Sequence, residues 1–173
     1  EPPAMLAHPL ADGRAVSVYR SLERTVEALG AVGSSYQSLF APLIDAWPQI
    51  EEAVLGPPRW PRHPVAVARF GLKALQSAEA LARQSFAGES VRALFAGIAA
   101  HSMLPLHMRP TAGVGLVLTL MAHVAGWVMP RGGAQSLSNA LAGYLRSLGG
   151  EIVTGTTVNS IDELPRARAV LCD

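Results

Sequence analysis

Residues 126–161 read GWVMPRGGAQSLSNALAGYLRSLGGEIVTGTTVNSI and place a turn, an amphipathic helix and strand-forming residues in immediate succession. Pro130 fixes its own φ and disfavours helical geometry at Met129, so any preceding helix ends there. Gly132 and Gly133 then allow a sharp turn or a close backbone approach. We therefore expect a helix to begin directly after this Pro-Arg-Gly-Gly turn.

The apolar residues after the turn recur at the spacing of a helix. They are Leu137, Ala140, Leu141, Tyr144, Leu145 and Leu148. Gly149 and Gly150 favour a left-handed C-terminal cap. Apolar residues at 152–153 and 158–161 predict two short strands or one bent strand interrupted at Gly155, and residues 169–172 predict another strand. Cys172, in the last of these segments, is expected to be a small core residue.

A glycine pair before a helix can also bind a ligand, because the first turn has unpaired N–H groups and the positive end of the helix dipole. Phosphate, a carboxylate or an electron-rich ring edge would be favoured there. On local grounds alone, a glycine pair before a helix is more often only a tight connection between two elements.

The composition limits the classes of function. The 173 residues are 50% hydrophobic, which is enough for one sizeable core or two small ones. Their 14 basic and 13 acidic side chains nearly balance, so no strong polyelectrolyte partner is implied. Residues 59–92 hold six basic and two acidic residues but lack base-reading motifs, so we expect no nucleic-acid partner. The single cysteine fits a reducing, cytoplasmic location, and the scattered histidines predict no metal site.

The first third of the chain predicts a hairpin followed by helices. Residues 8–21 contain an Asp12-Gly13 turn and alternating apolar residues, which indicate a hairpin or an edge strand. Ser21 is a good helix N-cap. Helices are expected at residues 22–29 and 34–47, separated by a glycine-containing turn.

The middle of the chain begins with a proline-rich loop. Four of the nine residues in 56–64 are proline, which excludes regular structure there. Residues 65–83 then predict one helix with Arg69, Lys73, Gln76 and Arg83 on a shared face. Such a face is either an ordinary solvated surface or a contact with an anionic membrane surface.

Two further helices are expected before the turn. Residues 89–101 have apolar residues at core spacing, and residues 111–129 contain no formally charged side chain over nineteen positions. Gly113, Gly115, Gly126 and His123 favour a buried or pocket-lining helix there over a bilayer span. The sequence thus predicts an α+β, mostly α-helical fold, with a helical domain at residues 1–129 and a helix with short strands at residues 130–173.

The ordered pattern of residues 126–161 resembles the corresponding segment of phytoene desaturase-like FAD-dependent oxidoreductases, within the flavin amine oxidase superfamily. The shared features are the Gly, the Pro-x-Gly-Gly turn, the helix, the Gly-Gly-Glu-Ile stretch and the strand around Val158. Residues 8–21 and 68–102 resemble the helical substrate domain of the same family more loosely. The family's GxGxxG phosphate-binding strand-turn-helix is not found in this sequence.

The resemblance implies roles for particular residues. Val158 matches the position whose backbone pairs with the adenine edge of FAD, and Arg131, Gly132 and Gly133 match the turn near the flavin and the substrate. It implies no catalytic base, since the flavin accepts the hydride and the protein supplies orientation and an apolar cavity. The residues expected to line that cavity are His101, Met103, Leu104, Leu118, Met121, His123 and Trp127.

We therefore expect an internal fragment of an FAD-dependent oxidoreductase whose intact form acts on an apolar, isoprenoid-like substrate. The fragment itself is expected to be inactive and to lack FAD. One alternative is a non-enzymatic module that binds an apolar ligand or lies peripherally on a membrane. Another is an inactive fragment that forms a homo-oligomer to cover its apolar surface.

Overall fold

The computed structural model describes residues 2–172 and divides them into two compact units. The first ends at Val128 and the second begins at Met129. Helices make up 57% of the chain and the only sheet in the described residues has two strands, so the fold is α+β and mostly helical, as the sequence predicts.

The first unit opens with the predicted hairpin. Strand β1 (Leu6–Pro9) pairs antiparallel with β2 (Ala15–Val18), with Leu6 opposite Val18. Gly13 has φ +83°, a value that favours glycine, and the backbone N–H of Arg14 donates to the Asp12 carboxylate at 3.0 Å. The Asp12-Gly13 pair therefore closes the hairpin. The adjacent Arg14 guanidinium also lowers the pKa of Asp12.

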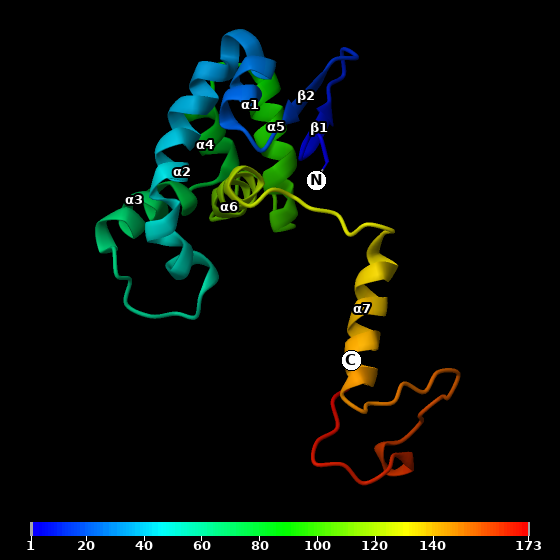
Figure 1. The fold of residues 1–173 in the computed structure, drawn as a ribbon. Coiled ribbons are helices and arrows are strands. Elements are labelled where there is room, and N and C mark those ends of the chain that lie inside the picture. The colour runs from blue at the N-terminus through cyan, green and yellow to red at the C-terminus, as the bar shows by residue number, and fades with distance from the viewer. Residues whose placement is uncertain (1, 173) are drawn as a thin grey trace. The chain divides into compact units, whose positions relative to one another are not determined.

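Helices follow the hairpin, and α6, seen end-on in Figure 1, crosses the helices that surround it. Ser21 caps the first helix, as predicted, by accepting from Arg24 N–H at 3.1 Å. The elements are α1 (Leu22–Leu29), the short 3₁₀ turn η1 (Gly30–Val32), α2 (Gly33–Leu55), α3 (Pro64–Ala74), α4 (Ala78–Ser85), α5 (Glu89–Ala99), the 3₁₀ turn η2 (Ala100–Ser102) and α6 (Thr111–Val124).

Three helix predictions need correction. The helix expected over residues 111–129 ends at Val124, before Gly126 with its φ of +78°. Helix α2 continues beyond Trp47, through Pro48, to Leu55. A proline removes one N–H donor, and continued burial of Ile50 on the same face offsets that loss. The helix predicted over residues 65–83 is two helices, because Ser77 caps α4 by accepting from Ala80 N–H at 3.2 Å.

The break between α3 and α4 is fixed by the start of α6. Ala112 N–H donates to the Gln76 carbonyl at 3.2 Å, and Ala78 N–H donates to the Thr111 hydroxyl oxygen at 2.9 Å. These backbone groups would otherwise lie buried without partners. The break places Arg83 on α4, on a different helix from Arg69 and Lys73.

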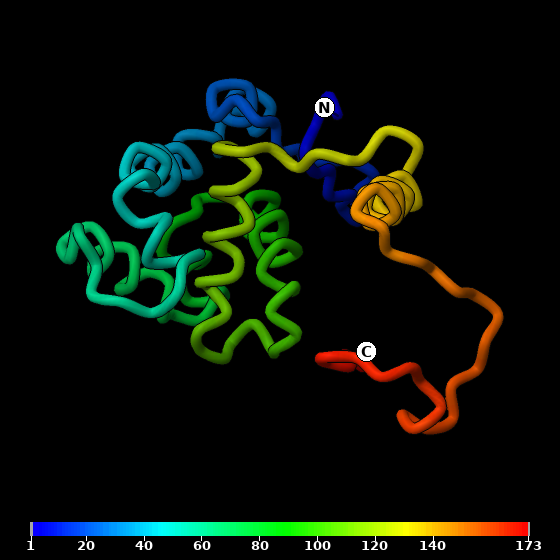
Figure 2. Tube along the Cα trace, turned by 60° about the horizontal axis from the view of Figure 1, so that its bottom comes forward, coloured from blue at the N-terminus to red at the C-terminus, as the bar shows by residue number. Residues whose placement is uncertain are grey.

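Helix α6 forms the centre of the first unit, between α2 and α5 (Figure 2). Its side chains Leu116 and Leu120 are fully buried. Gly115 permits the close crossing with α5, because a Cβ there would come within 2.8 Å of the Phe95 ring. Four aromatic rings, of Tyr36, Phe40, Phe86 and Phe95, pack beside this crossing at centroid separations from 4.5 to 6.5 Å.

The second unit consists of helix α7 (Ala134–Ser147), the 3₁₀ turn η3 (Ile161–Glu163) and irregular backbone. Gly149 has φ +83° and, with Gly150, caps α7 through bonds to the Arg146 and Leu145 carbonyls, as the glycine pair predicts.

The strands predicted at residues 152–153, 158–161 and 169–172 are wrong. A strand needs a neighbour for its N–H and C=O groups, and within residues 129–172 there is none. No side chain of this range is buried, and Cys172 is exposed where a core position was predicted.

The two units should respond differently to loss of apolar side chains. Phe40→Ala should lower the free energy of unfolding by about 3–5 kcal/mol, because it empties a buried site among four rings. Leu141→Ala on α7 should change it by less than about 0.5 kcal/mol, because Leu141 is 63% exposed. Urea unfolding followed by circular dichroism measures both, and equal losses would contradict this description of the core.

Candidate functional site

The Pro-Arg-Gly-Gly turn immediately precedes α7. Gly132 and Gly133 both have φ +84°. The turn is closed by Gly133 N–H donating to the Pro130 carbonyl at 3.0 Å and by the Ser136 hydroxyl donating to the Arg131 carbonyl at 2.7 Å. A Cβ on Gly132 would lie 2.7 Å from Ser136 Oγ, whereas one on Gly133 would meet nothing within 4 Å. Gly133 therefore presents an open stretch of backbone.

Val158 lies in an irregular segment and is 48% exposed. Its backbone has no neighbouring strand in the described part of this unit, so the edge expected to pair with adenine is not formed. The open backbone at Gly133 would let the edge of a ligand come close to the turn before α7. Residues 129–172 as described do not form a flavin site by themselves. We therefore derive no reaction step from this unit.

The seven residues predicted to line a substrate cavity do not converge on one. Met103 and Leu104 are exposed on the loop after η2, and His101 is exposed within η2. Three others lie on α6, where Leu118 and Met121 are half-buried and His123 is buried. Trp127 is half-buried after α6 and donates its backbone N–H to Met5 Sδ at 3.0 Å. The first unit has two larger grooves, one between α2 and α3 and one bordered by α4 and α5, and other residues line both.

His123 takes part in a buried hydrogen-bond chain that joins three segments. Its Nδ1 lies 3.0 Å from the Arg20 carbonyl oxygen, which only accepts, so Nδ1 carries the proton. Its Nε2, 2.8 Å from the Tyr36 hydroxyl, therefore accepts from Tyr36. The chain connects α6, α2 and the β2–α1 junction. It satisfies the polar atoms of both rings inside the core.

Burial controls the protonation of this pair. It raises the pKa of Tyr36 and lowers the pKa of His123. The Arg20 carbonyl and the charge of Glu23 act in the opposite direction on the His123 pKa, less strongly than burial. Both rings are therefore neutral near pH 7 and act as a structural link.

The sequence pattern indicates His123 as a candidate site residue and does not indicate Tyr36. Helical spacing with Phe40, Leu43 and Trp47 places Tyr36 on the buried face of α2, which is the signal that marks it as a core residue. Its pairing with a histidine 87 positions later is a tertiary contact without any local signal.

A groove of about 770 Å³ lies between α2 and α3. Its floor is formed by the buried side chains of Leu43, Ile50 and Phe70. Arg69 and Lys73 line its α3 side, opposite Asp45 on α2. Such a volume and an apolar floor with a few charged groups are typical of sites for small ligands. The helical spacing predicts the basic side chains of α3, but the groove could not be predicted, because α2 and α3 meet only in the folded chain.

The described residues contain neither a cluster of metal ligands nor a helix that could span a membrane. Among residues 2–172, no group of three or more His, Cys, Asp or Glu side chains is placed to hold a metal ion. In the same residues, no helix combines the length and the apolar character needed to cross a bilayer. No family model, curated protein or solved structure matches the chain.

The buried histidine makes stability depend on pH in a defined direction. Because the folded-state pKa of His123 lies below its ordinary value of 6.5, the unfolded chain binds this proton first as the pH falls. Stability should be independent of His123 above about pH 6.5 and should decrease below it, by at most about 1.4 kcal/mol per pH unit. Urea unfolding between about pH 8 and pH 5 measures this dependence.

Two variants separate His123 from the other titrating groups. His123→Asn should unfold more easily and lose much of the slope between about pH 6.5 and pH 5. His101→Asn, at an exposed histidine, should keep the slope of the parent chain. An undiminished slope in His123→Asn would show that the buried ring is not responsible.

Proposed function

We propose that the chain is part of an FAD-dependent oxidoreductase, similar to phytoene desaturases, that dehydrogenates an apolar substrate. The first unit corresponds to the helical substrate-binding part and the second to part of the flavin-binding domain. The 173 residues alone are proposed to be inactive and free of FAD, and the activity belongs to the intact enzyme.

The observation that carries this proposal is the turn before α7. The family resemblance is concentrated in residues 126–161, and within them both glycines of the Pro-Arg-Gly-Gly turn have φ +84°. Gly133 is open to approach and the first turn of α7 offers N–H donors. A side chain at Gly133 would occupy the space from which a ligand approaches.

The uncovered apolar face of α7 also supports the proposal. Leu137, Leu141, Tyr144 and Leu148 are more than half exposed although they recur at helical spacing. In a doubly wound flavin domain, such a face packs on a sheet. A helix whose apolar face is exposed in this chain is therefore expected to pack against further protein in the intact enzyme.

The test uses the intact protein and two matched glycines. Purified full-length protein should carry flavin, seen as visible absorption that is released on denaturation. Gly133→Ala should weaken flavin binding by at least about tenfold, because a methyl group enters the approach path and the φ of Gly133 is unfavourable for alanine. Gly149→Ala is the control, since Gly149 has φ +83° with open space around it at the other end of α7.

The proposal fails if the intact protein neither carries nor binds flavin. Equal weakening by Gly133→Ala and Gly149→Ala would assign the loss to the stability of α7 and would remove the turn from the site. Circular dichroism of both variants measures their helix content directly.

A further inference from the structure

An exposed tryptophan lies on the proline-rich loop of residues 56–63. Trp60 is 86% exposed, whereas the ring of Trp47 is buried. The two arginines beside it are tied to α2: Arg59 and Arg62 both pair with the Glu52 carboxylate, at 3.0 and 3.6 Å. Prolines and these ion pairs restrict the loop, so it presents the indole to solvent at a defined place.

Helix α3 continues this exposed surface. Val65 and Leu72 are 64% and 74% exposed, and Arg69 and Lys73 lie between and beside them at helical spacing. All four side chains line the α2–α3 groove. Within residues 2–172, neither Arg69 nor Lys73 forms an ion pair. The surface therefore carries two cations that form no ion pair, with the Asp45 carboxylate elsewhere on the groove, next to exposed aliphatic groups.

Trp60 and the α3 side chains belong to adjoining surfaces. Gln49 of α2 lines both the α2–α3 groove and the smaller depression that contains Trp60. Residues 56–76 hold four basic side chains and no acidic one. We call Trp60, Val65, Arg69, Leu72 and Lys73 the basic strip.

We propose that the basic strip docks on the surface of an anionic lipid bilayer. Trp60, Val65 and Leu72 would enter the headgroup region, where an indole favours the boundary between water and hydrocarbon. Arg69 and Lys73 would bind lipid phosphates and anionic headgroups. Because the two cations and the three apolar side chains come from adjacent parts of one surface, they can contact the bilayer together.

The charge pattern favours a bilayer over a protein surface as the partner. Interfacial helices combine a cationic side with exposed Trp and aliphatic residues, and this is the composition of the basic strip. Cores of protein interfaces are depleted in lysine. The inference does not rest on the proposed flavin chemistry, because it uses only residues of the first unit.

Sedimentation with vesicles tests the proposal on the full chain. The chain should bind vesicles made of equal parts phosphatidylcholine and phosphatidylglycerol. It should bind vesicles of phosphatidylcholine alone much more weakly. Arg69→Glu combined with Lys73→Glu should weaken binding by at least about thirtyfold, the effect of two cations that each contribute about 1 kcal/mol at such a surface. Arg69 is exposed and Lys73 is half-buried, and neither belongs to the buried core, so both changes leave the core side chains in place.

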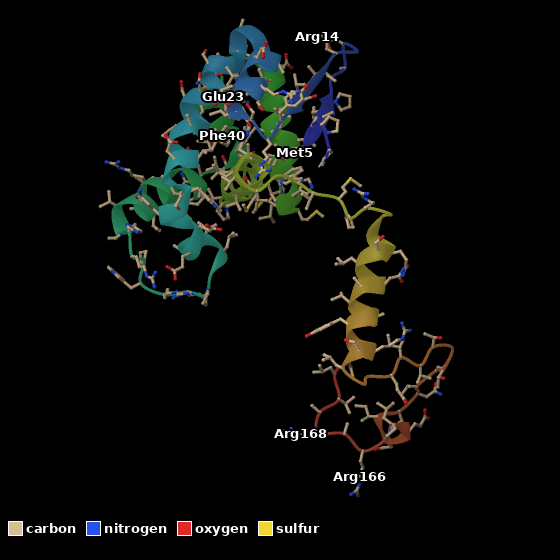
Figure 3. The ribbon with its side chains drawn as sticks, in the orientation of Figure 1. Met5, Arg14, Glu23, Phe40, Arg166 and Arg168 are labelled. Carbon is tan, nitrogen blue, oxygen red and sulfur yellow. The ribbon has the colours of Figure 1, made fainter. Side chains whose placement is uncertain are left out.

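Arg166→Glu combined with Arg168→Glu is the matched control. It changes the net charge by the same amount at two exposed arginines after α7 (Figure 3), and it should bind as the parent does. Trp60→Ala should also weaken binding, while Trp60→Phe keeps most of it because the ring still enters the headgroup region. Tryptophan fluorescence of the parent should shift to the blue on anionic vesicles, and this shift should be lost in Trp60→Phe.

Three results would overturn the proposal. One is equal binding of both vesicle types, and another is an equal loss in the two double charge reversals. The third is no vesicle binding combined with saturable binding of a dispersed anionic amphiphile such as laurate, which would assign the α2–α3 groove to a single ligand molecule.

Discussion

The structure of the first unit depends on the burial of α6, a helix without a formally charged side chain. Such a helix must be covered on all sides, and α2, α3, α4 and α5 all pack against it. Close packing requires small residues at the crossings, which explains Gly115 against Phe95. It also brings a polar ring, His123, into the core, where Tyr36 and the Arg20 carbonyl satisfy both nitrogens.

The second unit contrasts with this core. Helix α7 has a regular apolar face and well-formed glycine caps, yet none of its side chains is buried within the described residues. Local sequence is sufficient to form the turn, the helix and its cap, because each depends on neighbouring residues only. Burial of the apolar face requires another surface. In our proposal that surface belongs to the rest of a flavin-binding domain.

Local signals predicted most of the fold. The Asp12-Gly13 hairpin, the Ser21 cap and the Gly149 cap were predicted because each follows from backbone geometry at a few adjacent residues. Predictions that depend on distant partners failed. The break at Ser77 is fixed by Thr111 and Ala112, and the strands around Val158 lack a neighbour. For the same reason the sequence could suggest His123 as a site residue but could not identify Tyr36 as its partner.

Amide hydrogen exchange of the 173-residue chain tests most directly whether α6 organises the fold while α7 lacks a covering surface. We predict that amides of α6 and the facing part of α5 exchange only through global unfolding. Amides of α7 should exchange through local opening, much faster, and should not slow down when the first unit is stabilised. Equal protection of α6 and α7, lost together in denaturant, would contradict this account.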